Sequence, residues 1–236
     1  MKKIIGLLAG FAMLGSAHAA VVTYNFTATV ASIREALPPA YTSTLRDQST
    51  LTGMTVSVGQ AIHGSFSYDT AMGLDAIYQP APEASGTYLL YNDLNNTTKI
   101  TAPTVFARPQ EVIDETNLLQ IANDATTFAG GDILALSTTV MAPDFSSFNS
   151  TISLYDFSGK AFDHGGVPTA LNLSSFNYAG YELYYFPPTG GYVRIQSTMT
   201  ALTPAAAVPE PETYAMLMAG LALIGWRGRR AGKAGK

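Results

Sequence analysis

The sequence predicts an all-β protein whose body is an antiparallel β-sandwich or jelly roll. Three observations lead to this fold class. Hydrophobic and polar residues alternate over many short stretches, turn-forming residues separate these stretches, and the middle of the chain shows almost no helical periodicity. A chain of 236 residues is long enough for one sizeable domain with short appendages and too short for two.

The composition narrows the kinds of chemistry that the chain can carry. Charged residues make up only 13% of it, about half of the share usual in soluble proteins, so Ser, Thr and Asn are expected to form much of the surface. There is no cysteine. This excludes disulfides, thiolate nucleophiles, cysteine-ligated zinc and iron–sulfur clusters.

The first 19 residues are typical of a secretory signal peptide. Two lysines precede an apolar stretch, and Ala17 and Ala19 form a small-x-small cleavage site. Signal peptidase is therefore expected to release a mature chain that begins at Ala20. The apolar stretch is too short to span a membrane.

The first strand is expected directly after this signal, over residues 22–30. Its apolar positions share one face: Val22, Tyr24, Phe26, Ala28 and Val30. Thr and Asn occupy the other face, which is typical of a half-buried antiparallel strand. Comparable patterns predict strands over residues 54–58, 62–68, 87–91, 118–121, 133–140, 151–157, 181–186 and 192–202.

The segments between these strands are rich in Gly, Pro, Asn and Asp, as turns require. Residues 109–119 are the one stretch of the body with helical features, since Pro109 precedes three acidic residues. A helix there remains an alternative to a loop. No repeat of fixed period is visible, so short strands and frequent turns favour a sandwich or jelly roll over a solenoid or propeller.

The C-terminal segment, residues 208–236, has three parts. Pro209, Glu210 and Pro211 form an extended linker that neither a helix nor a sheet can continue. Residues 213–226 are apolar, and as a helix they would cover roughly 21 Å of a hydrocarbon core of about 30 Å, a marginal span. Five cations close the chain: Arg227, Arg229, Arg230, Lys233 and Lys236. The positive-inside rule keeps such a cationic tail on the cytoplasmic side.

This order of a Pro-Glu-Pro triplet, a short apolar helix and an arginine cluster resembles the PEP-CTERM sorting signal of exported bacterial proteins. The resemblance implies that the chain is anchored transiently in the inner membrane and recognised there by an exosortase. It further implies cleavage near the triplet and release or transfer of the upstream body. Short stretches of the body, such as residues 64–69 and 154–156, resemble bodies of uncharacterised PEP-CTERM proteins, which have no established activity.

The body, residues 20–207, is acidic. It holds six cations and 15 acids, so its net charge is about −9, because the other seven cations lie in the two end segments. This charge disfavours binding of nucleic acids and anionic lipids by the body, and no nucleic-acid partner is expected.

No catalytic constellation is visible in the body. Its only histidines are His63 and His164, which lack the spacing of a zinc site, and no Gly-x-Ser-x-Gly turn supplies a serine nucleophile. Phosphate-binding glycine loops are also missing. Paired carboxylates for glycoside hydrolysis stay open as an alternative, because 15 acids allow many pairs. We expect a protein that is not an enzyme.

Two binding sites remain as hypotheses. A structural calcium ion would require oxygen ligands from loops, and the candidate ligands are Asp93, Asp124 and Asp132. A sugar would require exposed aromatic rings, and the candidates are Tyr181, Tyr184 and Tyr192. Strand alternation sends Tyr181 to one face and Tyr184 to the other, so at least half of this cluster is expected in the core.

Together these features predict an exported, non-catalytic protein of the cell surface or extracellular matrix, such as that of a biofilm. An exosortase and signal peptidase are its expected processing enzymes. The alternative is a sandwich that binds or cleaves an exopolysaccharide. In that case Glu182, Tyr184 and a second acid would line one concave groove, whereas a flat, Thr-rich surface favours the first function.

Overall fold

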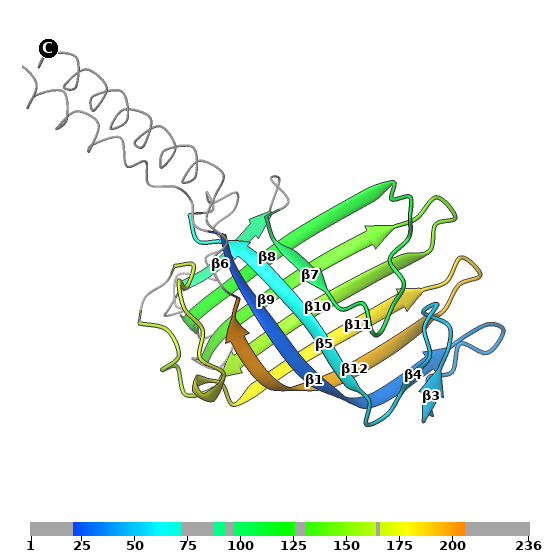
Figure 1. The fold of residues 1–236 in the computed structure, drawn as a ribbon, viewed down its shortest axis with the longest axis horizontal. Helices are drawn as coiled ribbons and strands as arrows, with labels where there is room; N and C mark the ends of the chain where they lie inside the picture. The colour runs from blue at the N-terminus through cyan, green and yellow to red at the C-terminus, as the bar shows by residue number, and fades with distance from the viewer. Residues whose placement is uncertain (1–20, 72–86, 93–96, 126–130, 164–165, 206–236) are drawn as a thin grey trace, which may run out of the picture. The chain divides into compact units, whose positions relative to one another are not determined.

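The computed structural model describes residues 21–71, 87–92, 97–125, 131–163 and 166–205 (Figure 1). Twelve strands occur in these ranges, and they are β1 (Val21–Ala36), β2 (Thr44–Arg46), β3 (Gln48–Ser49), β4 (Val56–Ser57), β5 (Ala61–Asp69), β6 (Thr87–Asn92), β7 (Lys99–Thr101), β8 (Asp114–Ala125), β9 (Gly131–Met141), β10 (Ser147–Asp156), β11 (Tyr178–Phe186) and β12 (Tyr192–Pro204). A short 3-10 turn, Leu173–Ser175, is the only helical element among them. The all-β prediction is therefore confirmed.

Ten of the strands form one antiparallel sheet in the order β6-β8-β9-β10-β11-β12-β1-β5-β7, with β2 pairing beside β5 on β1. The sheet curls so that β7, at one edge, contacts β9 and β10. Figure 1 shows β1 and β5 passing in front of β8–β11. A sandwich of two separate sheets is not confirmed. Strand β11 pairs with β12, and β12 pairs with β1, so one continuous sheet forms both layers. Alternation reports which residues share a face and cannot report which strands pair.

Strand β1 joins the two layers because it pairs with β12 along one edge and with β5 along the other. Its expected inward face is confirmed, since Tyr24, Phe26, Ala28 and Val30 are all buried. A register shift after Val30 then moves Ile33 to the buried face. Such an extra residue bends a strand and increases its twist, which suits a sheet that curls over itself.

Aromatic side chains fill the space between the layers. Tyr24 stacks on Phe66 with ring centroids 5.5 Å apart, and Phe26 stacks on Tyr181 at 5.6 Å. The Tyr24 hydroxyl accepts a hydrogen bond from the backbone N–H of Leu171 at 2.8 Å. Burial raises the pKa of the Tyr68 hydroxyl, which donates to the Pro168 carbonyl at 2.9 Å. Two core tyrosines thus hold the long segment between β10 and β11.

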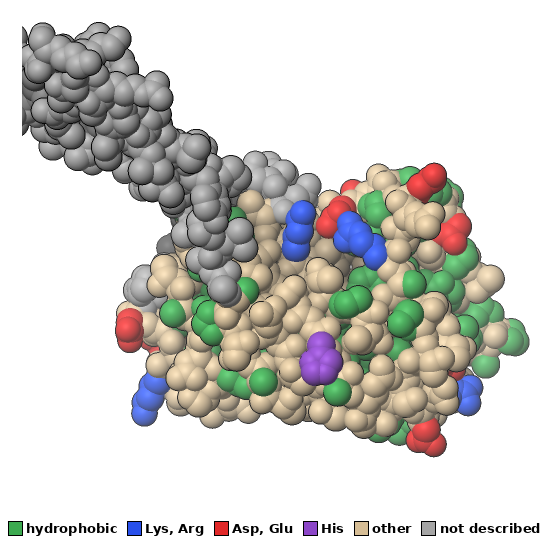
Figure 2. All heavy atoms as spheres, viewed as in Figure 1, with side chains coloured by type: hydrophobic (Ala, Val, Ile, Leu, Met, Phe, Trp, Pro, Cys, Tyr) green, Lys and Arg blue, Asp and Glu red, His purple; other side chains and the backbone are tan. Residues whose placement is uncertain are grey.

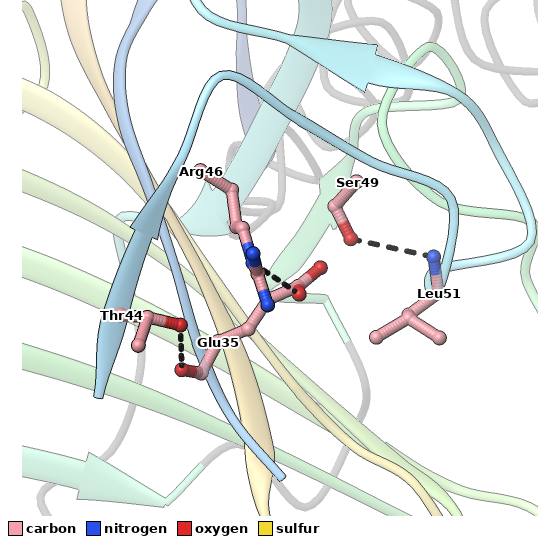
Figure 3. Close-up of polar contacts among 5 residues, drawn as sticks. All are labelled: Glu35, Thr44, Arg46, Ser49 and Leu51. Carbon is pink, nitrogen blue, oxygen red and sulfur yellow. Dashed lines mark hydrogen bonds and ion pairs between the residues drawn. The ribbon is translucent and has the colours of Figure 1, made fainter. Parts of the chain in front are cut away.

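The chain after β1 is fixed by polar contacts (Figure 3). Arg46 Nε donates to Glu35 Oε2 at 3.0 Å, and Thr44 Oγ1 donates to the Glu35 carbonyl oxygen at 3.2 Å. Further on, the N–H of Leu51 donates to Ser49 Oγ at 3.4 Å. The Arg46 side chain is half exposed, so its ion pair stabilises the fold by less than about 1 kcal/mol.

Gly64 on β5 lies directly opposite Phe26 on β1, and this pair requires a glycine. A Cβ atom at residue 64 would lie 2.5 Å from Phe26 Cζ and 2.5 Å from the Thr101 carbonyl oxygen. Gly64→Ala is therefore expected to lower the free energy of unfolding by about 2 kcal/mol. Urea unfolding measures this, with Ser65→Ala as the control on the opposite face. Equal stability of the two variants would contradict the packing described.

Residues 109–119, the one helical alternative in the body, form no helix. Residues 109–113 are irregular, and β8 begins at Asp114. In the ranges that the structure covers, no helix has the length and apolar character needed to cross a membrane. The chain divides into two units, Met1–Ala205 and Ala206–Lys236. The expected signal peptide and the expected short membrane helix both lie outside the described residues.

Candidate functional site

The three tyrosines expected at a sugar site are separated by the sheet. Tyr181 is only 1% exposed, and its hydroxyl lies 3.2 Å from Ser150 Oγ in the core. Burial raises the pKa of this hydroxyl. The prediction that Tyr181 contacts a sugar is wrong, because the strand turns this ring inward against Phe26.

Tyr184 and Tyr192 lie on the outer face of the sheet, opposite to the core. Tyr184 stacks almost parallel to Phe186, with centroids 5.9 Å apart and planes 9° apart. Tyr192 lies 5.9 Å from the Tyr184 ring at a steeper angle. The Arg194 guanidinium carbon is 5.3 Å above the Tyr184 ring, and Arg194 is paired with Glu182 through its Nε. We call the three rings of Tyr184, Phe186 and Tyr192 the aromatic corner. The opposite charges of Glu182 and Arg194 beside it compensate each other.

The electrostatics of this corner keep the phenol of Tyr184 protonated. Burial raises its pKa first, and the nearby Glu182 carboxylate raises it further, while Arg194 acts in the opposite direction. A protonated phenol can both donate and accept a hydrogen bond. A depression of about 330 Å³ borders the ring and is lined by Thr139, Asn149, Tyr184 and Phe186.

Two of the three expected calcium ligands lie near each other, but in an arrangement that serves the fold. Asp132 is fully buried, and its carboxylate accepts from the backbone N–H of Asp124 at 3.0 Å and of Phe162 at 2.9 Å. The Asn123 amide, turned with its nitrogen toward the carboxylate, donates to it at 3.2 Å. Asp93 lies outside the described residues. No group of three His, Cys, Asp or Glu side chains suited to a metal occurs in the described ranges, and the calcium ion stays a prediction.

A second buried carboxylate, Asp156, was not singled out from the sequence. It lies directly across from Asp132 in the β9–β10 register and is 2% exposed. Its oxygens accept from the N–H and hydroxyl of Ser158 and from the N–H of Lys160 at 2.7–2.9 Å. Burial raises the pKa of Asp156, but these donors outweigh it, so the pKa lies below the ordinary value. The two carboxylates organise the loop that follows β10.

The histidine positions give no catalytic arrangement. His63 is exposed on β5, as its place on the polar face predicted, and its Nδ1 lies 3.3 Å from Thr27 Oγ1. His164 lies outside the described residues. A nucleophile activated by a base would need a serine within hydrogen-bond reach of an imidazole.

A larger cleft, of about 490 Å³, lies at the strand ends near the β9–β10 hairpin. Leu51, Pro143, Phe148 and Tyr185 are among its lining residues. Figure 2 shows hydrophobic side chains gathered at the right of the view, where the β9–β10 and β11–β12 hairpins lie in Figure 1. Most charged side chains in this view lie near the margin. This cleft could not be predicted from local patterns, because its walls come from segments far apart in the chain.

The remaining predicted residues lie in the two end segments, outside the described residues. They are Ala17, Ala19 and Ala20 of the signal cleavage site, Pro209, Glu210 and Pro211 of the triplet, and Arg227, Arg229 and Arg230 of the cationic tail. The described chain ends close to the triplet, where the N–H of Ala205 donates to the Thr23 carbonyl oxygen at 2.8 Å.

Comparison with known proteins gives one match, and it falls on this tail. Residues 207–231 match the family model described as the PEP-CTERM protein-sorting motif. No curated protein matches the chain, and no solved structure does. The motif supports export, transient anchoring through the C-terminus and processing by an exosortase. The chain thus carries a PEP-CTERM sorting motif directly after the last strand of an all-β body.

Proposed function

We propose that this protein is a non-catalytic component of the cell surface or extracellular matrix, delivered there by exosortase processing. The observation that carries the proposal is the position of the sorting motif. It begins at residue 207, three residues after β12 ends at Pro204, so cleavage near the Pro-Glu-Pro triplet leaves the folded sheet complete. A processing site outside the folded domain is what such a delivery route requires.

The use of the acidic side chains supports a non-catalytic role. A carboxylate that acts as general acid or nucleophile must face the substrate with a suited pKa. The carboxylates of Asp132 and Asp156 instead accept hydrogen bonds from backbone N–H groups of the loop after β10, and Glu182 pairs with Arg194.

The intact mass of the native protein tests this proposal, measured separately on material from membranes and from culture medium. We expect a species that begins at Ala20 and ends near Pro211. Mass added to the new C-terminus would identify the group to which the protein is attached. A single species that retains Trp226 and the cationic tail in both fractions would overturn exosortase delivery.

The second candidate is a protein that binds an exopolysaccharide. One specific observation favours it, the stacked pair of Tyr184 and Phe186 on the solvent side of the sheet. Cleavage of the polymer has less support, because the Glu182 carboxylate beside these rings is already held by Arg194.

A further inference from the structure

Three depressions follow one another on the outer face of β8–β11. The first, of about 330 Å³, is the one beside Tyr184 and Phe186. The second, of about 250 Å³, is lined by Leu118, Gln120, Ala135, Ser137 and Thr151. The third, of about 220 Å³, includes Ile133, Tyr155 and Phe157. The strand register makes them neighbours, because Asn149, Thr151 and Tyr155 alternate along the same face of β10. We call this series the outer-face groove.

The groove follows from side-chain size. Small residues occupy its middle, where Ala135 on β9 pairs with Ser153 on β10. On β11 the Tyr178 hydroxyl lies over Gly180, the partner of Ser153, and bounds the groove on that side. Larger side chains stand at its border, among them Gln120 on β8 and Glu182 on β11. From Asn149 to Tyr155 the strand advances six residues, or roughly 20 Å, which is long enough for several linked sugar rings.

The floor of the groove is a network of neutral polar groups. Asn149 Nδ2 donates to Ser137 Oγ at 2.9 Å and to Thr139 Oγ1 at 2.7 Å, while Asn149 Oδ1 accepts from Thr151 Oγ1 at 3.2 Å. Each accepting hydroxyl still carries a hydrogen that it can donate. Ser137 and Thr139 can therefore each donate a hydrogen bond to a ligand while they accept from Asn149.

Aromatic rings stand at both ends of this floor. At one end Tyr184 and Phe186 are stacked. At the other end Tyr155 stacks on Tyr178 with centroids 5.5 Å apart, and Phe157 lies 6.3 Å from Tyr155. Phe157 is 66% exposed and Phe186 is 40% exposed, so both keep ring surface open to a ligand. Exposed rings of this kind bind the apolar C–H faces of sugars, while hydroxyl floors bind their polar edges.

The charges of the groove select against an anionic polymer. Glu182 at its side is neutralised by Arg194. Asp132 and Asp156 contribute to the third depression but direct their carboxylates to the N–H groups of the following loops. The body carries a net charge of about −9, which disfavours binding of an acidic chain. A peptide fits less well, because the backbone groups of these central strands already pair with each other.

We propose that the outer-face groove binds a neutral polysaccharide along β9 and β10, with sugar rings on the aromatic side chains at its two ends. This deepens the second candidate function. The proposal rests on the proposed function, because the body meets extracellular polymers only if the protein is exported. Tyr192, the third ring of the aromatic corner, lies beside the first end.

Affinity electrophoresis of the full processed protein tests the proposal. Native gels contain hydroxyethylcellulose or dextran as neutral polymers and alginate as an anionic polymer of similar size. We expect at least one neutral polymer to retard the protein and alginate to leave its mobility unchanged. Free migration in both neutral polymers, or equal retardation by alginate, would overturn the proposal.

Substitutions in the groove test whether the polymer binds there. Tyr184→Ala combined with Phe186→Ala is expected to raise the dissociation constant about tenfold, because two stacking surfaces are lost. Ser137→Tyr, which fills the middle of the groove from its solvent side, is expected to abolish retardation. The matched control is Phe145→Ala, since Phe145 is 74% exposed on the β9–β10 hairpin and outside the groove. Unfolding midpoints of all variants verify that the fold is retained.

Two results would overturn the location of the site. One is unchanged binding by the groove variants, and the other is an equal loss in Phe145→Ala. Failure of this proposal is distinguishable from failure of exosortase delivery. A protein with correctly processed termini that binds no neutral polymer would leave delivery supported and remove the polysaccharide site.

Discussion

Asp156→Ala is expected to lower the free energy of unfolding by about 3 kcal/mol at pH 7. The Asp156 carboxylate is buried and accepts from the N–H groups of Ser158 and Lys160, both within 2.9 Å. Alanine would remove the charged acceptor of these part-buried N–H donors, and a hydrogen bond to a charged group contributes about 1.5–3 kcal/mol. The loop after β10, whose Phe162 packs edge-on against Phe176, would lose its anchor. Urea unfolding measures the effect.

The same carboxylate gives this effect a defined pH dependence. The pKa of Asp156 lies below its ordinary value of 3.8 because the loop donors outweigh burial. A group with a lowered pKa in the folded state stabilises the fold fully above its unfolded pKa, which is about 3.9. That contribution is lost as the pH falls through the folded pKa. The stability gap between the native protein and Asp156→Ala is therefore expected to be constant from pH 5 to 7 and to narrow below about pH 4.

Asp163→Ala is the matched control, because Asp163 is an exposed carboxylate seven residues further along the same loop. Its removal is expected to change the free energy of unfolding by less than about 0.5 kcal/mol. If Asp156→Ala were no more destabilising than this control, the carboxylate would not anchor the loop.

Local patterns in the sequence were sufficient to predict the longer strands and the C-terminal sorting motif. The alternation in β1 correctly identified Tyr24 and Phe26 as inward-facing, and the expected strands over 133–140 and 192–202 fall within β9 and β12. The sorting motif was recognisable because its three parts, the Pro-Glu-Pro triplet, the apolar segment and the arginine cluster, follow one another in the sequence. Each of these features depends on residues that are close in the chain.

Features that depend on distant residues could not be predicted in the same way. Alternation placed Tyr181 and Tyr184 on opposite faces of β11, but only the pairing of the whole sheet determines that the Tyr181 face is inside. The partnership of Asp132 and Asp156 arises from the β9–β10 register. The outer-face groove requires residues of β8, β9 and β10 to align. The short strands β2, β3 and β7 escaped notice because two or three residues carry too little alternation.

Replacement of Pro209, Glu210 and Pro211 by alanine is expected to abolish processing at the C-terminus while export continues. The triplet lies within the matched sorting motif and follows the end of β12 in the sequence, so its replacement alters no strand of the described body. Alanines would also replace two prolines, which interrupt helices, by residues that favour a helix. The expected result is an uncut form in the membrane fraction that keeps Trp226, detected by intact mass.

Glu212→Ala is the matched control, because it removes one acid from the same linker and leaves the triplet intact. We expect this variant to be processed as the native protein is. Normal release of the triplet variant would refute dependence on an exosortase. Accumulation of both variants in uncut form would instead assign recognition to the charge of the linker, because Glu210 and Glu212 are its two acids. The two substitutions together therefore separate recognition of the Pro-Glu-Pro sequence from a general effect of linker charge.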